Sequence, residues 1–234
     1  MSDNGRMPLR VLHTADLHLE IFGDSACRGL EAVVNVAITA KVDLVIIAGD
    51  LFDHNRVRDN VVSFAIEQLQ RLSVDVVILP GNHDCLAADS VFGRMGLWQT
   101  CTNVRFLRSP EGETLDLPDL GVSLWGKPID TYDGDIHPLD GIPRPVPNGH
   151  WHVAIAHGYY VTEPPVFPSF HITEEEIATS GWDYIALGHY PGFRCVCNEP
   201  VKAYYCDSPV SGTVNIIDFS EEAGVQVTRY AFPK

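Results

Sequence analysis

The sequence has little positive charge and few cysteines. Its 234 residues carry 16 Lys and Arg against 31 Asp and Glu, which gives a formal net charge of -15. Nucleic-acid affinity rests largely on cations that neutralise phosphates, so this balance argues against strong binding along a duplex. The six cysteines contain no Cys-x-x-Cys pair and are too few for a disulfide scaffold. We therefore expect reduced thiols and a cytoplasmic protein.

Long apolar runs are also missing. The longest, residues 44–48, is far shorter than the roughly 20 residues that a membrane span requires, and residues 1–10 contain no apolar signal-peptide core. We expect a soluble protein without a membrane partner. With 45% hydrophobic residues and no clear linker, the chain is expected to form one domain over residues 1–234, with residues 1–9 flexible.

The first half of the chain alternates strand and helix patterns. Short apolar runs predict strands over 10–14, 43–48 and 74–79, and apolar residues at helical spacing predict helices over 26–38 and 59–72. This βαβαβ order predicts a parallel sheet. After residue 104 the pattern changes to short strands, at 122–125, 153–156, 184–187, 193–196, 203–206, 214–219 and 225–230. We expect these to form a second, mixed sheet in an α/β fold.

Two proline-rich segments interrupt the second half. Residues 126–149 contain five prolines, which exclude a helix or a central strand and predict a long surface loop. Residues 163–170 contain three more. Because loops at strand ends carry specificity, we expect both segments to shape the mouth of a pocket. Between this second segment and the next strand, Thr173 followed by three glutamates predicts the start of a short helix.

Polar side chains follow five of the predicted strands. The segments are Asp16-Leu17-His18, Gly49-Asp50-Leu51-Phe52-Asp53, Gly81-Asn82-His83-Asp84, His157-Gly158 and Gly188-His189. The carboxyl ends of neighbouring parallel strands converge on one crevice, so we expect the first three segments to meet in space. A single Asp or His beside a strand is more often a turn former or a buried polar group, but five such segments in order predict a shared metal site.

The residue types favour particular metals. Carboxylate and amide oxygens mixed with imidazole nitrogens suit manganese, iron or zinc better than calcium or magnesium alone. Asp16 and His18 are two residues apart, so on extended backbone both side chains leave on one face and can hold the same ion. Asp50 follows a glycine that permits a tight turn, and its two oxygens make it the candidate bridge between two cations.

These motifs make the sequence similar to the calcineurin-like metallophosphoesterases. The matching segments are DLH at 16–18, GDLFD at 49–53, GNHD at 81–84, HG at 157–158 and LGHYP at 187–191, and their surroundings resemble the branch that includes the nuclease of double-strand-break repair. The resemblance implies a four-layer α/β/β/α sandwich of two mixed sheets. It also implies a two-metal site between them.

The same resemblance implies a ligand set. One ion would be held by Asp16, His18 and Asp50, and the other by Asp50, Asn82, His157 and His189. In the family the last motif is usually Gly-His-x-His, and its second histidine completes the first site. Here that position is Pro191, which has no side-chain donor. The first site would therefore keep only three protein ligands.

The resemblance further assigns catalytic roles. Two divalent cations neutralise the phosphate oxygens and lower the pKa of a water toward 7, so that it attacks phosphorus in line. His83 would then supply a proton to the leaving group, Asp53 would orient His83, and His54 would contact substrate phosphate. An exposed loop histidine is an equally good interpretation of His54.

The sequence therefore predicts a metal-dependent phosphoesterase with two divalent ions, manganese first, and favours phosphodiesters over monoesters. Its substrate would be a small phosphoester, or a nucleic-acid end presented by a partner. One alternative is a DNA exonuclease or endonuclease of repair. Another is a catalytically impaired metal-binding scaffold, because Pro191 replaces a usual ligand. The oligomeric state does not follow from the sequence.

Overall fold

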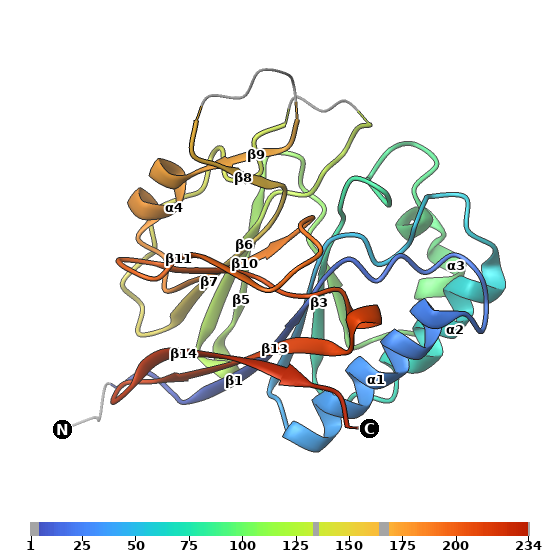
Figure 1. Ribbon diagram of the computed structural model, residues 1–234, viewed down its shortest axis with the longest axis horizontal. Coiled ribbons are helices and arrows are strands. Elements are labelled where there is room, and N and C mark those ends of the chain that lie inside the picture. Colours follow the sequence, from blue (N-terminus) through green and yellow to red (C-terminus); the bar gives the residue numbers. More distant parts are fainter. Residues whose placement is uncertain (1–4, 133–135, 164–168, 234) are drawn as a thin grey trace.

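Two six-stranded sheets lie face to face, with helices on their outer faces (Figure 1). The computed structural model describes residues 5–132, 136–163 and 169–233. The alternating first half forms β1 (Leu9–Thr14), α1 (Ser25–Ala40), β2 (Leu44–Ala48), α2 (Asp59–Leu69) and β3 (Asp75–Leu79). The second half contains η1 (Val91–Gly93), α3 (Met95–Trp98), β4 (Val104–Phe106), β5 (Glu113–Leu117), η2 (Pro118–Leu120), β6 (Val122–Gly126), β7 (Trp151–His157), β8 (Tyr159–Val161), β9 (His171–Thr173), α4 (Glu174–Ser180), β10 (Tyr184–Gly188), β11 (Arg194–Cys197), β12 (Lys202–Tyr205), η3 (Pro209–Ser211), β13 (Thr213–Ser220) and β14 (Gly224–Ala231).

Both sheets are mixed. The first has the order β14-β13-β1-β2-β3-β4, in which β1 to β4 are parallel, β13 is antiparallel to β1, and β14 is antiparallel to β13. The second has the order β11-β12-β10-β7-β6-β5, with a parallel centre and an antiparallel strand at each edge. The short strands β8 and β9 form a separate parallel pair. The predicted βαβαβ unit and a mixed second sheet are therefore confirmed. The strands expected over 214–219 and 225–230 were wrongly assigned to the second sheet: as β13 and β14 they extend the first sheet, because β13 pairs with the free edge of β1.

The core explains why the layers stack. Apolar side chains between the two sheets, among them Val11, Ile46 and Val153, form one buried cluster. A second cluster lies under α1 and α2, where Leu30 and Val34 of α1 face the sheet at helical spacing. A third lies on the outer face of the second sheet under α4 and the segment around Leu139. The expected four-layer sandwich is confirmed, with α4 as its short fourth-layer helix.

Local signals set the helix boundaries. The side chain of Asp24 caps α1 by accepting the Cys27 N–H, and the helix ends at Lys41 in the left-handed conformation. At α4, Thr173 and Glu176 form a reciprocal capping box. This is the helix start that the glutamate run predicts.

The remaining expectations concern the proline-rich loops, the N-terminus, the cysteines and membrane spans. Parts of the two proline-rich segments, residues 133–135 and 164–168, lie outside the described residues, as do residues 1–4 of the expected flexible N-terminus. Within the segment expected to be flexible, Arg6 Nη1 forms an ion pair with Asp183 Oδ1, at 2.8 Å. All six cysteines are free thiols. In the described part of the chain, no helix has the length and apolarity to span a membrane.

Candidate metal centre

The polar residues of the five motifs lie close together at the carboxyl ends of strands from both sheets. From the first sheet, the loops after β1, β2 and β3 bring Asp16, His18, Asp50 and Asn82, and from the second, β7 ends at His157 and β10 precedes His189. Two overlapping groups of potential ligand atoms result, Asp50 with His157 and His189, and Asp16 with His18 and Asp50. Within each group these atoms lie within 4.8 Å of one another.

The group that contains Asn82 is the tighter one. Asn82 Oδ1 lies 3.0 Å from His157 Nε2 and 2.8 Å from His189 Nδ1. The two imidazole nitrogens are 3.2 Å apart, and Asp50 Oδ2 lies 3.2 Å from His157 Nε2. Two residues of the first sheet and two of the second therefore point four polar atoms at one position.

His157 is fully buried, and both of its nitrogens are engaged. Nδ1 lies 2.8 Å from the carbonyl oxygen of Ala48 and donates to it, so Nε2 faces the group. Burial lowers the pKa of His157, but the charge of Asp50 and their hydrogen bond outweigh burial and raise that pKa to about 9. Burial raises the pKa of Asp50, and the same pairing outweighs it and lowers this pKa to about 2. Asp50 is therefore a buried anion.

Asp16 and His18 approach Asp50 from the other side. His18 Nε2 lies 4.0 Å from Asp16 Oδ1 and 3.8 Å from Asp50 Oδ2. The Asp16 carboxylate also accepts the backbone N–H of His189, at 3.1 Å and 3.0 Å to its two oxygens. Asp50 thus lies between the two groups, where a bridging carboxylate would be.

Four of these residues have unusual backbone conformations. φ is 53° at Asp16, 52° at His18, 53° at Asp50 and 96° at His189. Residues other than glycine rarely adopt a positive φ, and such backbone strain is concentrated at functional sites. The motifs identify the residue types, but nothing in the sequence indicates this conformation.

Two glycines allow the close approach of the loops. A Cβ atom on Gly49, where φ is 94°, would lie 2.0 Å from His157 Nδ1. A Cβ atom on Gly81 would lie 2.2 Å from Asp50 Oδ1. Any side chain at either position would therefore displace a residue of the candidate centre.

A model of a known protein family matches the part of the sequence that carries these residues. The model of the calcineurin-like phosphoesterases aligns with residues 9–193, a range that contains every residue discussed so far in the centre. The chain belongs to the calcineurin-like phosphoesterase family. Enzymes of this family use pairs of divalent metal ions.

Individual relatives show how far the likeness extends. The chain is 28% identical to the DNA double-strand break repair protein Mre11 of Methanopyrus kandleri, over 91% of this chain and 50% of that protein. It is 25% identical to the uncharacterised metallophosphoesterase YhaO of Bacillus subtilis, over 77% of this chain and 48% of that protein. The chain thus spans about half the length of these curated relatives.

A solved structure supports the fold alone. A dimetal phosphatase from Danio rerio superposes with a TM-score of 0.59 and 12% identity, over 95% of this chain and 99% of that chain. At this identity the likeness establishes the calcineurin-like sandwich and says nothing of substrate.

The donor set fits the divalent ions of the calcineurin-like family. Because Nδ1 of His157 donates to Ala48, Nε2 is the nitrogen that faces the acceptor oxygens of Asp50 and Asn82. With a pKa of about 9, His157 carries a proton on Nε2 at neutral pH, and a metal ion would displace that proton on binding. A cation satisfies such a cluster of acceptors. Carboxylate, amide and imidazole ligands suit manganese, iron and zinc.

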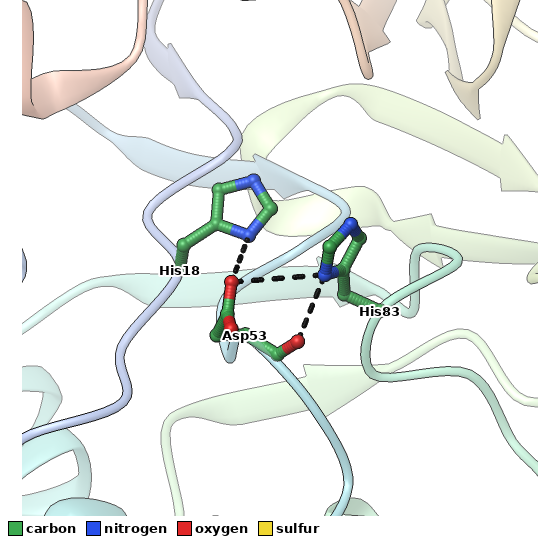
Figure 2. Close-up of side chains that lie close together, drawn as sticks. All are labelled: His18, Asp53 and His83. Carbon is green, nitrogen blue, oxygen red and sulfur yellow. Dashed lines mark hydrogen bonds and ion pairs between the residues drawn. The ribbon is translucent and has the colours of Figure 1, made fainter.

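His83 lies beside the centre and is oriented by Asp53. Its backbone N–H donates to Asp50 Oδ1 at 3.0 Å, and its Nδ1 donates to the backbone carbonyl of Asp53 at 2.8 Å. Figure 2 shows that the Asp53 carboxylate faces both His18 and His83. It lies 3.1 Å from His18 Nδ1 and 3.7 Å from His83 Nδ1. The backbone carbonyl of Asp53 therefore orients His83, while the Asp53 carboxylate lies closer to His18 than to His83. The sequence does not indicate this contact with His18.

Asp84 is a residue of the centre to which the motifs assign no role. It is fully buried and accepts the N–H groups of Phe52 at 3.0 Å and Gly81 at 2.8 Å. Burial raises its pKa to about 7. Asp84 ties the loop after β2 to the loop after β3. The sequence contains one signal for this role of Asp84. It lies three residues after Gly81, a spacing that lets an aspartate side chain accept a backbone N–H within the same turn.

His54 lies at the edge of the centre. Its Nδ1 accepts the Arg56 N–H at 3.1 Å, and its Nε2 lies 3.9 Å from Glu20 Oε1. The ligand-type atoms of Glu20, Asp53 and His54 form a further group within 4.8 Å of one another. His54 also lines a cavity of about 550 Å³ together with Arg56 and Arg58. The structure thus places His54 between Asp53 and this cavity.

Proposed function

We propose that this chain is a phosphodiesterase that acts with two divalent metal ions. The observation that carries the preference for diesters is the cavity lined by His54, whose ligand-type atom lies within 4.8 Å of that of Asp53, the neighbour of His18. A phosphodiester has a second substituent on phosphorus that needs room, whereas a monoester has none. Among the described residues, the side chains of Arg56 and Arg58 make no ion pair, so both charges are available to an anionic substrate.

The proposed ligand assignment follows the two groups. Asp16, His18 and Asp50 would hold one ion, and Asp50, Asn82, His157 and His189 the other. Manganese is the first candidate, and iron or zinc would suit the same donors. When bound, the ions supply positive charge against the phosphate oxygens and lower the pKa of a water toward 7.

The remaining residues would orient the substrate and move a proton. Because Nδ1 of His83 donates to the Asp53 carbonyl, its Nε2 is the atom that can hold the proton for the leaving oxygen. Asp53 keeps His83 and His18 in fixed orientations from one loop. His54, which lines the cavity, would contact a phosphate oxygen.

The test compares bis(4-nitrophenyl) phosphate with 4-nitrophenyl phosphate in the presence of Mn²⁺. We expect a higher kcat/KM for the diester. Arg56→Gln with Arg58→Gln should reduce that ratio, whereas Arg105→Gln, an exposed arginine on β4, should leave it unchanged. Faster turnover of the monoester, with no effect of the cavity arginines, would contradict the proposal.

His83 has its own test within this proposal. His83→Ala should lower kcat about 100-fold or more for diesters with alkyl leaving groups, and less for 4-nitrophenyl esters, because a good leaving group needs no proton. An equal loss for both leaving groups would exclude the assigned role. A chain that binds metal and hydrolyses none of these esters would instead be a scaffold.

Action on nucleic-acid ends is the second candidate. The relative from Methanopyrus kandleri that favours it carries the name of a DNA repair protein and aligns over 91% of this chain. The test uses end-labelled single-stranded and duplex oligonucleotides with Mn²⁺. With a net charge of -15, we expect weak duplex binding by the chain alone and cleavage only where an end or an unpaired strand reaches the centre.

A further inference from the structure

Exposed aromatic rings lie on segments that follow the strands leading to the candidate metal centre. Among the described residues, the large aromatic side chains that are exposed to solvent all lie on segments that follow β1, β6, β7 or β10, namely Phe22, Tyr132, Tyr159, Tyr190 and Phe193. Most other aromatic rings of the described chain lie in its apolar clusters or pack against them. Exposed apolar groups that collect on one rim mark a binding surface.

One of these rings contacts a candidate metal ligand of the second sheet, and another belongs to the residue that follows this ligand in sequence. The ring of Tyr159 stands at 82° to the ring of His189, with 4.1 Å between their centroids, and Tyr159 is 46% exposed. Tyr190 follows His189 directly and is 38% exposed, while its ring packs on Tyr205 at 5.4 Å. Both rings are thus supported from one side and open on the other.

An arginine extends this surface. The guanidinium of Arg194 lies 5.4 Å from the ring centroid of Tyr160 and 5.9 Å from that of Tyr190. These are cation–π distances, which hold the flat guanidinium group against the rings. In a chain with few basic residues, Arg194 therefore places one positive charge beside Tyr190, the residue that follows His189.

We propose that Tyr159, Tyr190 and Arg194 form a stacking surface that binds a planar aromatic ring of the substrate, next to the phosphate at the metal centre. The inference rests on the proposed function, because it assigns a substituent to the phosphoester held there. Stacking on exposed rings is insensitive to the identity of the planar group. The ring is therefore that of a nucleobase or of an aryl alcohol.

Binding of two phosphonates tests the proposal without turnover, because their P–C bonds are not hydrolysed. Phenylphosphonate and ethylphosphonate are titrated calorimetrically into the Mn²⁺-loaded chain. We expect phenylphosphonate to bind about tenfold more tightly, in line with the stacking of one ring. Tyr159→Leu with Tyr190→Leu should remove most of this difference and leave the affinity for ethylphosphonate unchanged.

The matched control is Phe193→Leu. Phe193 lies on the same loop, but its ring packs against Tyr204 and under Arg229 rather than at His189. This variant should keep the full preference for the phenyl compound. Equal affinities of the two phosphonates in the wild-type chain would overturn the proposal, as would a preference that survives the double tyrosine substitution.

Turnover identifies the source of the ring. Thymidine 5′-(4-nitrophenyl phosphate), phenyl 4-nitrophenyl phosphate and ethyl 4-nitrophenyl phosphate share one leaving group, so kcat/KM compares the other substituent. A preference for the thymidine ester points to a nucleobase, and a preference for the phenyl ester to an aryl group. Ring-selective binding without turnover of any ester would contradict the proposed function alone, and turnover without ring selectivity would contradict this inference alone.

Discussion

Asp50 is the residue on which most contacts of the centre converge. One of its oxygens accepts the His83 N–H, the other lies 3.2 Å from His157 Nε2, and the backbone of Gly81 passes too close to leave room for a side chain. Its negative charge raises the pKa of His157 against the effect of burial. A single carboxylate thus links the loops of the first sheet to a buried histidine of the second.

His13 makes stability depend on pH. It is fully buried, and burial lowers its pKa to about 3, whereas the unfolded chain takes up a proton near 6.5. The folded state therefore binds fewer protons, so its stability is complete above pH 6.5 and is lost as pH falls toward 3. Between pH 6.5 and 5 this group costs roughly 2 kcal/mol.

We expect His13→Gln to reduce this loss of unfolding free energy between pH 7 and pH 5. The measurement is urea unfolding with a chelator present, so that metal release does not contribute. His137→Gln, which alters an exposed imidazole, is the control and should keep the wild-type slope. Parallel slopes for wild type and His13→Gln would show that His13 is not responsible.

Asp84 is expected to be needed for the shape of the centre. Asp84→Ala leaves the buried N–H groups of Phe52 and Gly81 without an acceptor, which should lower the unfolding free energy by about 3 kcal/mol and weaken Mn²⁺ binding. Asp84→Asn retains one acceptor oxygen and should lie in between. The exposed Asp89→Ala is the control. Unchanged Mn²⁺ affinity in Asp84→Ala, measured calorimetrically, would refute this role.

Residue types were more predictable than their contacts. A metal site at the strand ends follows from residues such as Asp16 and Asn82, because carboxylates and amides at the ends of parallel strands have few other common uses. The sequence does not reveal that the Asp53 carboxylate is closer to His18 than to His83, because that depends on the path of the loop after β2. The roles assigned to single residues remain predictions.

At the scale of elements, the loop between β10 and β11 supplies only one imidazole to the centre. It contains His189, and two residues later Pro191, which has no donor atom. Under the proposed assignment, Asp16, His18 and Asp50 are therefore the candidate ligands of the first ion among the described residues. The two ions should consequently bind with unequal affinities.

Pro191→His is predicted to raise the affinity of the weaker of the two sites. A new imidazole in the loop after β10 would add a ligand. We expect the affinity for Mn²⁺ to rise by about tenfold or more, since even the loss of a residue that only supports a metal ligand changes metal affinity by about tenfold. Calorimetric titration with Mn²⁺ resolves the two sites. Pro191→Ala is the control, and an identical effect of both substitutions would show that loop flexibility, not the imidazole, is responsible.

Long periodic elements were predictable and short ones were not. Helix α1 and strands β1 to β3 follow from apolar spacing and turn residues. The strands β4, β8 and β9 have three residues each, too few for a period to appear, and β5 is an edge strand whose residues are at least partly exposed. The parallel pairing of β12 with β10 also has no local signal, because the partner is chosen by tertiary packing.

For the whole molecule, the candidate centre connects the two sheets. Asp50 and Asn82 come from the first sheet, and His157 and His189 from the second. Ions held by both should stabilise the folded state, because the unfolded chain has no such site. Removing metal is therefore a test of the architecture as well as of the chemistry.

Chelation is expected to lower the thermal midpoint by roughly 5 to 10 °C relative to protein with free Mn²⁺ at about 100 times the dissociation constant. Scanning calorimetry with and without a chelator measures the shift. His189→Ala should show a smaller shift, because it removes a proposed ligand from the second sheet, and His150→Ala, outside both candidate groups, should show the full shift. A midpoint independent of metal would mean that ions do not connect the sheets.

The most direct test counts the ions. Metal-stripped protein is titrated with Mn²⁺, and electron paramagnetic resonance measures the concentration of the free ion. The wild type is compared with Asp50→Asn. Asparagine is chosen because it tolerates the left-handed backbone conformation at this position. We predict two bound Mn²⁺ per wild-type chain and the loss of at least one in the variant, because an amide cannot bridge two cations. Equal, weak binding by both proteins would contradict a dinuclear centre built around Asp50.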